Sequence, residues 1–76
     1  MNNTMRSQID EILSQIESLK DDIQGILDQE EEYKESIPEN MQSGERYCRS
    51  EERVSELEDC ISSIEQAFES LESAKE

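Results

Sequence analysis

Apolar residues in the first half of the chain recur at alternating steps of four and three positions. Such spacing keeps them on one face of an α-helix and is typical of the a and d positions of a coiled coil. We assign position a to Ile9, Ile16 and Ile23, and position d to Met5, Ile12, Leu19 and Ile26. Leu13 and Leu27 fall at position e and widen the apolar face on one side. The pattern predicts a first helix over about residues 5–36.

A second column of apolar residues follows the same rule in the other half of the chain. Position a is taken by Tyr47, Val54, Ile61 and Phe68, and position d by Leu57, Ile64 and Leu71. Ser50 occupies the first d position, and small residues widen the face at position g, namely Cys60, Ala67 and Ala74. The column predicts a second helix over about residues 44–73, with Ser43 as its N-cap.

Residues 37–43 between the two columns have the composition of a connector. Pro38 is the only proline, and it disfavours helical backbone at Ile37 before it. So short a connector folds the second helix back on the first, and residues whose numbers add up to about 80 then face each other. We therefore predict an all-α fold in which residues 1–76 form one domain, a coiled-coil-like antiparallel two-helix hairpin.

This register pairs apolar side chains with apolar side chains in nearly every layer. The predicted pairs are Tyr33 with Tyr47, Ile26 with Val54, Ile23 with Leu57, Leu19 with Ile61, Ile16 with Ile64, Ile12 with Phe68, and Ile9 with Leu71. The exception joins Glu30 to Ser50, and because both polar interruptions fall in one layer, an intramolecular hairpin is favoured. Arginines at the start of the second helix are expected near the acidic residues 30–35, and these are Arg46, Arg49 and Arg53.

A chain of 76 residues, of which 32% are hydrophobic, forms only a small core by itself. The widened apolar face is also broader than a two-helix seam needs. We therefore expect a homodimer that closes into a four-helix bundle, and the alternative is a groove for a helix of another protein. The predicted core and dimer face consists of Ile9, Leu13, Ile16, Leu27, Cys60, Ile64, Phe68 and Leu71.

The charge balance of the chain indicates which class of molecule it can bind. With 21 acidic and 7 basic residues, the formal net charge of −14 disfavours direct binding to nucleic acid or to an anionic membrane. It favours a protein with a basic surface, and carboxylates along two long helices are similar in charge to the phosphates of DNA. The alternative is that the acidity serves only solubility. The predicted acidic contact face consists of Asp10, Glu17, Asp21, Glu58, Glu65 and Glu69.

Side chains for catalysis or for metal binding are scarce. The chain has no histidine, so the commonest general base and metal ligand is missing. Cys48 and Cys60 lie too far apart on one helix for a disulfide, which indicates free thiols in a reducing compartment. No signal peptide or apolar membrane span is found. We expect neither an enzyme, a metal site nor a cofactor, and a cytoplasmic location.

The connector, Ile37-Pro38-Glu39-Asn40-Met41-Gln42-Ser43-Gly44-Glu45-Arg46-Tyr47, and the downstream segment of residues 57–65 carry a resemblance. Together they resemble a family of short acidic helical-hairpin proteins from phages and mobile elements of Gram-positive bacteria. Met41 stands where this family has leucine, and the Ser-Gly order is reversed. The family brings no activity with it. It implies a setting inside a bacterial host cell, where small acidic phage proteins bind and block host proteins.

These observations lead to one functional hypothesis and one alternative from a different class. The hypothesis is a non-catalytic, phage-encoded inhibitor that binds a basic surface of a host protein for defence or for nucleic-acid handling, with DNA mimicry as a possible mode. The alternative is a structural or assembly coiled-coil protein whose acidic face confers only solubility.

Overall fold

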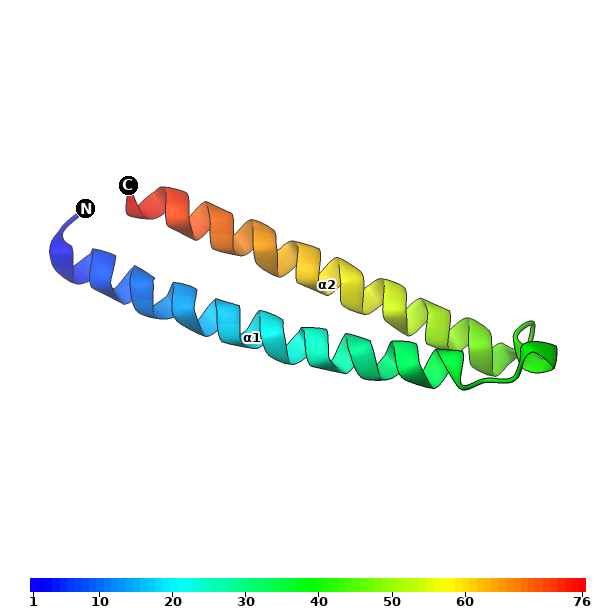
Figure 1. The fold of residues 1–76 in the computed structure, drawn as a ribbon. Helices are drawn as coiled ribbons and strands as arrows, with labels where there is room; N and C mark the ends of the chain where they lie inside the picture. The colour runs from blue at the N-terminus through cyan, green and yellow to red at the C-terminus, as the bar shows by residue number, and fades with distance from the viewer.

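The computed structural model describes all 76 residues as one long helical hairpin. Helix α1 spans Asn3–Glu35, the short 3-10 helix η1 spans Glu39–Met41, and α2 spans Glu45–Lys75. The two long helices run antiparallel and bring the chain termini to the same end (Figure 1). The molecule measures 60 × 15 × 11 Å and has no strand. The predicted all-α antiparallel hairpin is confirmed.

Local hydrogen bonds mark where the helices begin and end. The side chain of Asn2 caps α1 by accepting a hydrogen bond of 2.8 Å from the backbone N–H of Met5. The N-cap of α2 is Gly44, so the prediction of Ser43 is wrong by one position. The reason is a close approach, because a Cβ at position 44 would lie 3.2 Å from the carbonyl oxygen of Met41. Glycine fits this tight turn with no side chain to displace.

The connector is anchored by Ile37, whose side chain is only 3% exposed. Pro38 follows in an extended conformation, and the backbone N–H of Met41 then donates to the carbonyl of Pro38 at 2.9 Å. The side chain of Gln42 donates to the carbonyl of Ile37 at 3.4 Å. The turn therefore combines one buried apolar anchor with backbone hydrogen bonds.

The face of α1 that packs on α2 differs from the predicted one. Positions a and e point inward: Ile9, Leu13 and Leu27 are buried, and Leu27 forms a cluster with Val54 and Ile61 against which Ile23 and Leu57 pack. Position d points outward, with Ile12, Leu19 and Ile26 at 44%, 56% and 53% exposed. The predicted pairs that used position d therefore have an exposed side chain on α1 and do not form buried layers, and they are Tyr33 with Tyr47, Ile26 with Val54, Leu19 with Ile61, and Ile12 with Phe68.

Lysine side chains accompany this rotation of α1. Apolar residues occupy positions a and d of α1 and recur at position e as Leu13 and Leu27, and one neighbouring helix can cover only two of these columns. Lys20 and Lys34 also lie at position e. Turning position e inward brings Lys20 across to α2, where its Nζ lies 3.3 Å from Glu65 Oε1. Both lysines are half-buried, so their apolar stems contribute to the seam.

The predicted polar layer of Glu30 and Ser50 is confirmed. Ser50 is 0% exposed, and its hydroxyl donates to Glu30 Oε1 at 2.9 Å. The same carboxylate oxygen lies 3.3 Å from Arg53 Nη1. No buried side-chain nitrogen or oxygen lacks a hydrogen-bond partner. The layer is thus fully satisfied, which a lone polar residue in an apolar seam would not be.

Candidate functional site

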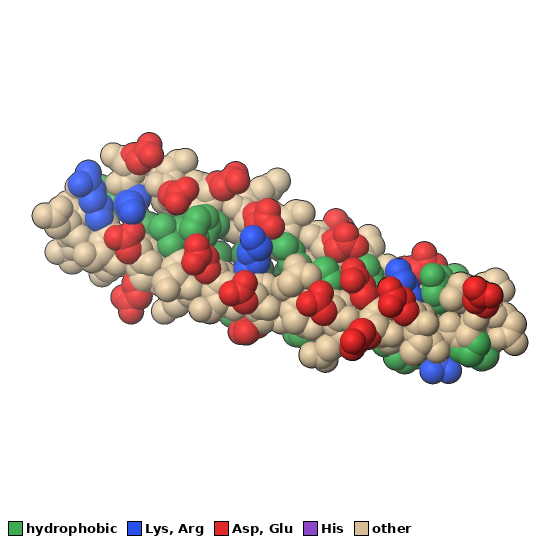
Figure 2. Space-filling model, viewed as in Figure 1, with side chains coloured by type: hydrophobic (Ala, Val, Ile, Leu, Met, Phe, Trp, Pro, Cys, Tyr) green, Lys and Arg blue, Asp and Glu red, His purple; other side chains and the backbone are tan.

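One side of the hairpin carries carboxylates along both helices, with apolar side chains visible between them (Figure 2). On α2 the carboxylates form a column at position e, one every seven residues, consisting of Glu51, Glu58, Glu65 and Glu72. All four are exposed. The ion pair of Glu65 with Lys20 places this column beside position e of α1. We call this side of the molecule the acidic face.

The structure leaves all six predicted acidic contact residues in solvent, and they are Asp10, Glu17, Asp21, Glu58, Glu65 and Glu69. Three of them, Glu17, Glu65 and Glu69, line one cavity of about 210 Å³ together with Lys20. The other three do not line it. The predicted residues are therefore all exposed but do not converge on one point.

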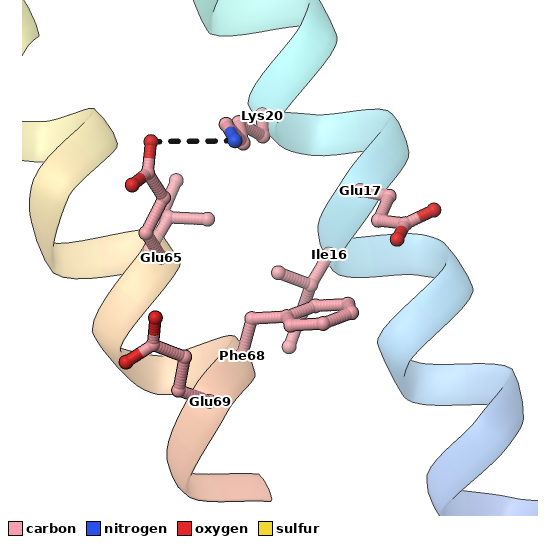
Figure 3. Close-up of a pocket in the computed structure, with 7 residues that line it drawn as sticks. Ile16, Glu17, Lys20, Glu65, Phe68 and Glu69 are labelled. Carbon is pink, nitrogen blue, oxygen red and sulfur yellow. Dashed lines mark ion pairs between the residues drawn. The ribbon is translucent and has the colours of Figure 1, made fainter. Parts of the chain in front are cut away.

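The cavity lies between the two helices in the half of the hairpin near the termini. Its apolar wall is formed by Ile16, Ile64 and Phe68. Phe68 and Ile16 point toward each other across the gap, whereas Glu17 points away from α2 (Figure 3). The pair of Lys20 and Glu65 bridges the helices beside these apolar side chains (Figure 3). An apolar floor with a charged rim suits an inserted apolar side chain of a protein partner.

Lysines neutralise two of the six predicted residues. Glu65 is paired with Lys20, and Asp10 Oδ1 lies 2.8 Å from Lys75 Nζ. The hydrogen bond that Lys75 donates to Asp10, and then the negative charge of Asp10, raise the pKa of Lys75 above the usual 10.5. Four ion pairs in the whole chain engage only four of the 21 carboxylates. The acidic face therefore keeps most of its negative charge available.

Arginines gather at the turn end of the hairpin around Tyr33. Arg46 Nε donates to the Tyr33 hydroxyl at 2.7 Å, and its guanidinium lies 5.5 Å from the centre of the Tyr33 ring. Arg49 pairs with Glu45 of its own helix at 2.8 Å. Arg53 reaches the acidic end of α1, through Glu30. Arg46 and Arg53 therefore lie beside residues 30–35 as expected, Arg46 through Tyr33 and Arg53 through Glu30, whereas Arg49 forms its ion pair within α2.

Sequence reasoning missed a second surface, a row of exposed apolar side chains along α1. The row, which we call the α1 stripe, consists of Met5, Ile12, Leu19, Ile26 and Tyr33. These residues had been assigned to the seam. Position e could have revealed this stripe, because Leu13 and Leu27 suit the seam as well as the residues at position d do. Cys60, predicted in the core and dimer face, is exposed, whereas Ile16, Ile64, Phe68 and Leu71 are half-buried.

The chemistry available at these surfaces is that of carboxylates, guanidinium groups and apolar side chains. No three His, Cys, Asp or Glu side chains are grouped so that they could hold a metal ion. Cys48 and Cys60 are free and exposed. None of the helices has the length and apolar character that crossing a membrane requires.

Comparisons of the chain with protein-family models, with curated proteins and with solved structures give no match.

Proposed function

We propose that the chain is a non-catalytic protein-binding module that docks its acidic face on a basic surface of another protein. The observation that carries the proposal is the excess of carboxylates without an ion partner, 17 of the 21 in the chain. Such a concentration of one charge speeds the approach of an oppositely charged partner and excludes acidic ones. Catalysis has no part in this proposal.

The charge density of the hairpin can be compared with that of DNA. A net charge of −14 over a length of 60 Å gives one charge per about 4 Å. A DNA strand carries one charge per about 3.4 Å, and the duplex one per about 1.7 Å of its axis. A single hairpin therefore matches one strand. Two hairpins side by side would give one charge per about 2 Å, which approaches the duplex.

This comparison links mimicry of duplex DNA to dimerisation. We propose a homodimer, closed into a four-helix bundle, as the form that binds a protein with a nucleic-acid groove. The phage setting and the role of inhibitor rest on the connector resemblance alone, and so does the location inside a bacterial host cell. The charge density supports the mimicry of DNA, and the connector supports the phage setting. Because the two arguments are independent, either of these parts can fail without the other.

The test immobilises the chain and captures proteins from a bacterial lysate at low and at raised salt. We expect nucleic-acid-binding proteins to be retained at low salt, and to be released by salt or by added duplex DNA. A variant that neutralises the four unpaired predicted residues should lose this capture, and its changes are Glu17→Gln, Asp21→Asn, Glu58→Gln and Glu69→Gln. A partner that salt and duplex DNA leave bound would refute the proposal.

A matched control removes the same number of charges elsewhere. Exposed carboxylates at position c of α1 and position f of α2 lie on the outer sides of the two helices, and the control changes are Glu11→Gln, Glu32→Gln, Glu52→Gln and Asp59→Asn. Equal loss of capture in both variants would show a dependence on total charge and not on the acidic face.

The exposed α1 stripe favours a second candidate function, that of a structural or assembly protein whose acidity confers only solubility. An apolar row of this length is typical of a surface that another helix covers. In that case both charge variants keep their partners and differ from the natural chain only in solubility. The two functions are therefore separated by the same pair of variants.

A further inference from the structure

The α1 stripe lies beside a column of smaller residues on α2. Arg46 contacts Tyr33 directly, which places position g of α2 next to position d of α1. Both columns step by seven residues in opposite directions, so the neighbourhood repeats along the hairpin. The following pairs are Ile26 with Arg53, Leu19 with Cys60, Ile12 with Ala67, and Met5 with Ala74. We call this double column the stripe face.

Half of the stripe face carries no charge. In the half near the termini the central residues are Met5, Ile12, Leu19, Cys60, Ala67 and Ala74. The heptad places Gln8 and Gln15 along its α1 edge, and Ser63 and Ser70 along its α2 edge. A chain that is 37% charged thus keeps half of one face free of charge. Depletion of charged residues is the compositional mark of an interface core.

We propose that the stripe face is the interface between two copies of this chain, packed face to face with their turns at opposite ends. The inference rests on the homodimer proposed above and identifies the surface that it uses. A two-fold axis passes through the layer of Leu19 and Cys60. Leu19 then packs on Leu19 of the second copy, Ile12 on its Ile26, and Met5 on its Tyr33.

The size of the face fits a second copy. Seven of 76 residues are buried in one hairpin, and one of these is a serine, so the isolated chain has a very small core. A face of 60 by 15 Å has a footprint of about 900 Å². A stable protein interface of standard size buries about 800 Å² on each partner. The whole stripe face therefore provides the area that a stable dimer needs.

Symmetry and charge select the orientation with opposite turns. Leu19 is the middle residue of the α1 stripe, and Cys60 is the middle residue of the neighbouring column. One two-fold axis through this layer therefore places each column against the same column of the second copy. Arg46 and Arg53 then lie against the alanines of the second copy, where their stems can pack and their guanidinium groups reach water. With the turns together, the arginines of both copies would meet at one end and repel each other.

The first experiment measures the mass of the protein by sedimentation at tens of micromolar. The natural chain should sediment at twice its 8.8 kDa. Leu19→Glu places two carboxylates together on the axis and should produce monomers. The matched control, Ser62→Glu, adds the same charge to an exposed position of α2 away from the stripe face and should remain dimeric. A monomeric natural chain with full helix content would overturn the proposal.

The second experiment needs no disruptive substitution and therefore does not depend on how Leu19→Glu folds. In the Cys48→Ser variant, Cys60 is the only thiol, and a short bismaleimide should link two copies through it. In the Cys60→Ser variant, Cys48 lies off the stripe face and should not link. A dimer that links through Cys48, or that fails to link through Cys60, would overturn this axis.

These outcomes are separable from those of the acidic-face proposal. A chain that sediments as a monomer but still captures partners in a salt-dependent way refutes the stripe-face dimer alone. A dimer linked through Cys60 that captures nothing refutes the docking function alone.

Discussion

In the polar layer of Glu30 and Ser50, a single substitution should lower the stability of the fold, whereas a double substitution should raise it. Ser50 is fully buried, and the side chain of Glu30 is 19% exposed. Ser50→Ala removes the hydrogen bond of 2.9 Å to the carboxylate. A hydrogen bond to a charged group contributes about 1.5–3 kcal/mol. We expect the lower end, about 1.5 kcal/mol of lost stability, because Arg53 still contacts Glu30.

Replacing both residues by apolar ones removes the desolvation cost of the buried polar pair and leaves no buried polar group without a partner. In Glu30→Leu with Ser50→Val, an apolar pair continues the seam beside Leu27 and Val54. Exchange of a buried polar or ionic pair for well-packed apolar residues is neutral or stabilising by about 1–4 kcal/mol. Since Glu30 is mostly but not fully buried, we expect a gain of about 1–3 kcal/mol.

Urea unfolding followed by far-ultraviolet circular dichroism measures both effects. For a chain this small the free energy changes by roughly 1 kcal/mol per molar urea. The midpoint should therefore fall by about 1.5 M for Ser50→Ala and rise by about 1–3 M for the double variant. All samples need the same protein concentration, because self-association adds stability that depends on it. A double variant less stable than Ser50→Ala would refute the reasoning.

Three further predictions test other parts of the structure. Leu27→Ala should cost about 2–4 kcal/mol because Leu27 is buried, whereas Leu19→Ala should change the stability of the dilute monomer by less than about 0.5 kcal/mol; equal costs would contradict the rotation of α1. Gly25→Ala should stabilise α1 by about 1 kcal/mol in thermal unfolding, since a Cβ there meets nothing within 4 Å, and no gain would indicate a contact at this position. A nuclear magnetic resonance titration should give Lys75 a pKa above 10.5, and this pKa should fall in the Asp10→Asn variant. Because the pKa of Lys75 is higher in the folded state, the pair stabilises the fold below pH 10.5, and this stabilisation is lost as the pH rises through the folded pKa.

The sequence was sufficient for the hairpin and for the layer of Glu30 and Ser50. Both follow from spacing, because two columns with one polar interruption each can match in only one register. It was not sufficient for the rotation of α1, since apolar residues occupy positions a and d and recur at position e. The contact of Lys20 with Glu65 across the seam joins two flanking columns, and no pattern within one helix contains it.

The candidate surfaces were predicted unevenly for the same reason. Exposure of the six acidic residues follows from their polar heptad positions and required no knowledge of the seam. The neutralisation of Asp10 by Lys75 was missed, because the second helix continues to Lys75 and does not end at about residue 73 as predicted. The α1 stripe was missed because its residues had been placed in the core. The exposure of polar positions was therefore predictable, whereas the choice of which apolar positions of α1 pack against α2 was not.

The antiparallel path of the chain makes each contact across the hairpin close a loop of different length. The bond between Ser50 and Glu30 closes 20 residues, whereas the bond between Lys75 and Asp10 closes 65. If each formed first in an open chain, the longer loop would cost about 1 kcal/mol more in entropy. Folding should therefore begin at the turn and proceed toward the termini, like a zipper. The charge-free half of the stripe face and the cavity beside Phe68 are then the last parts to form and the first to open.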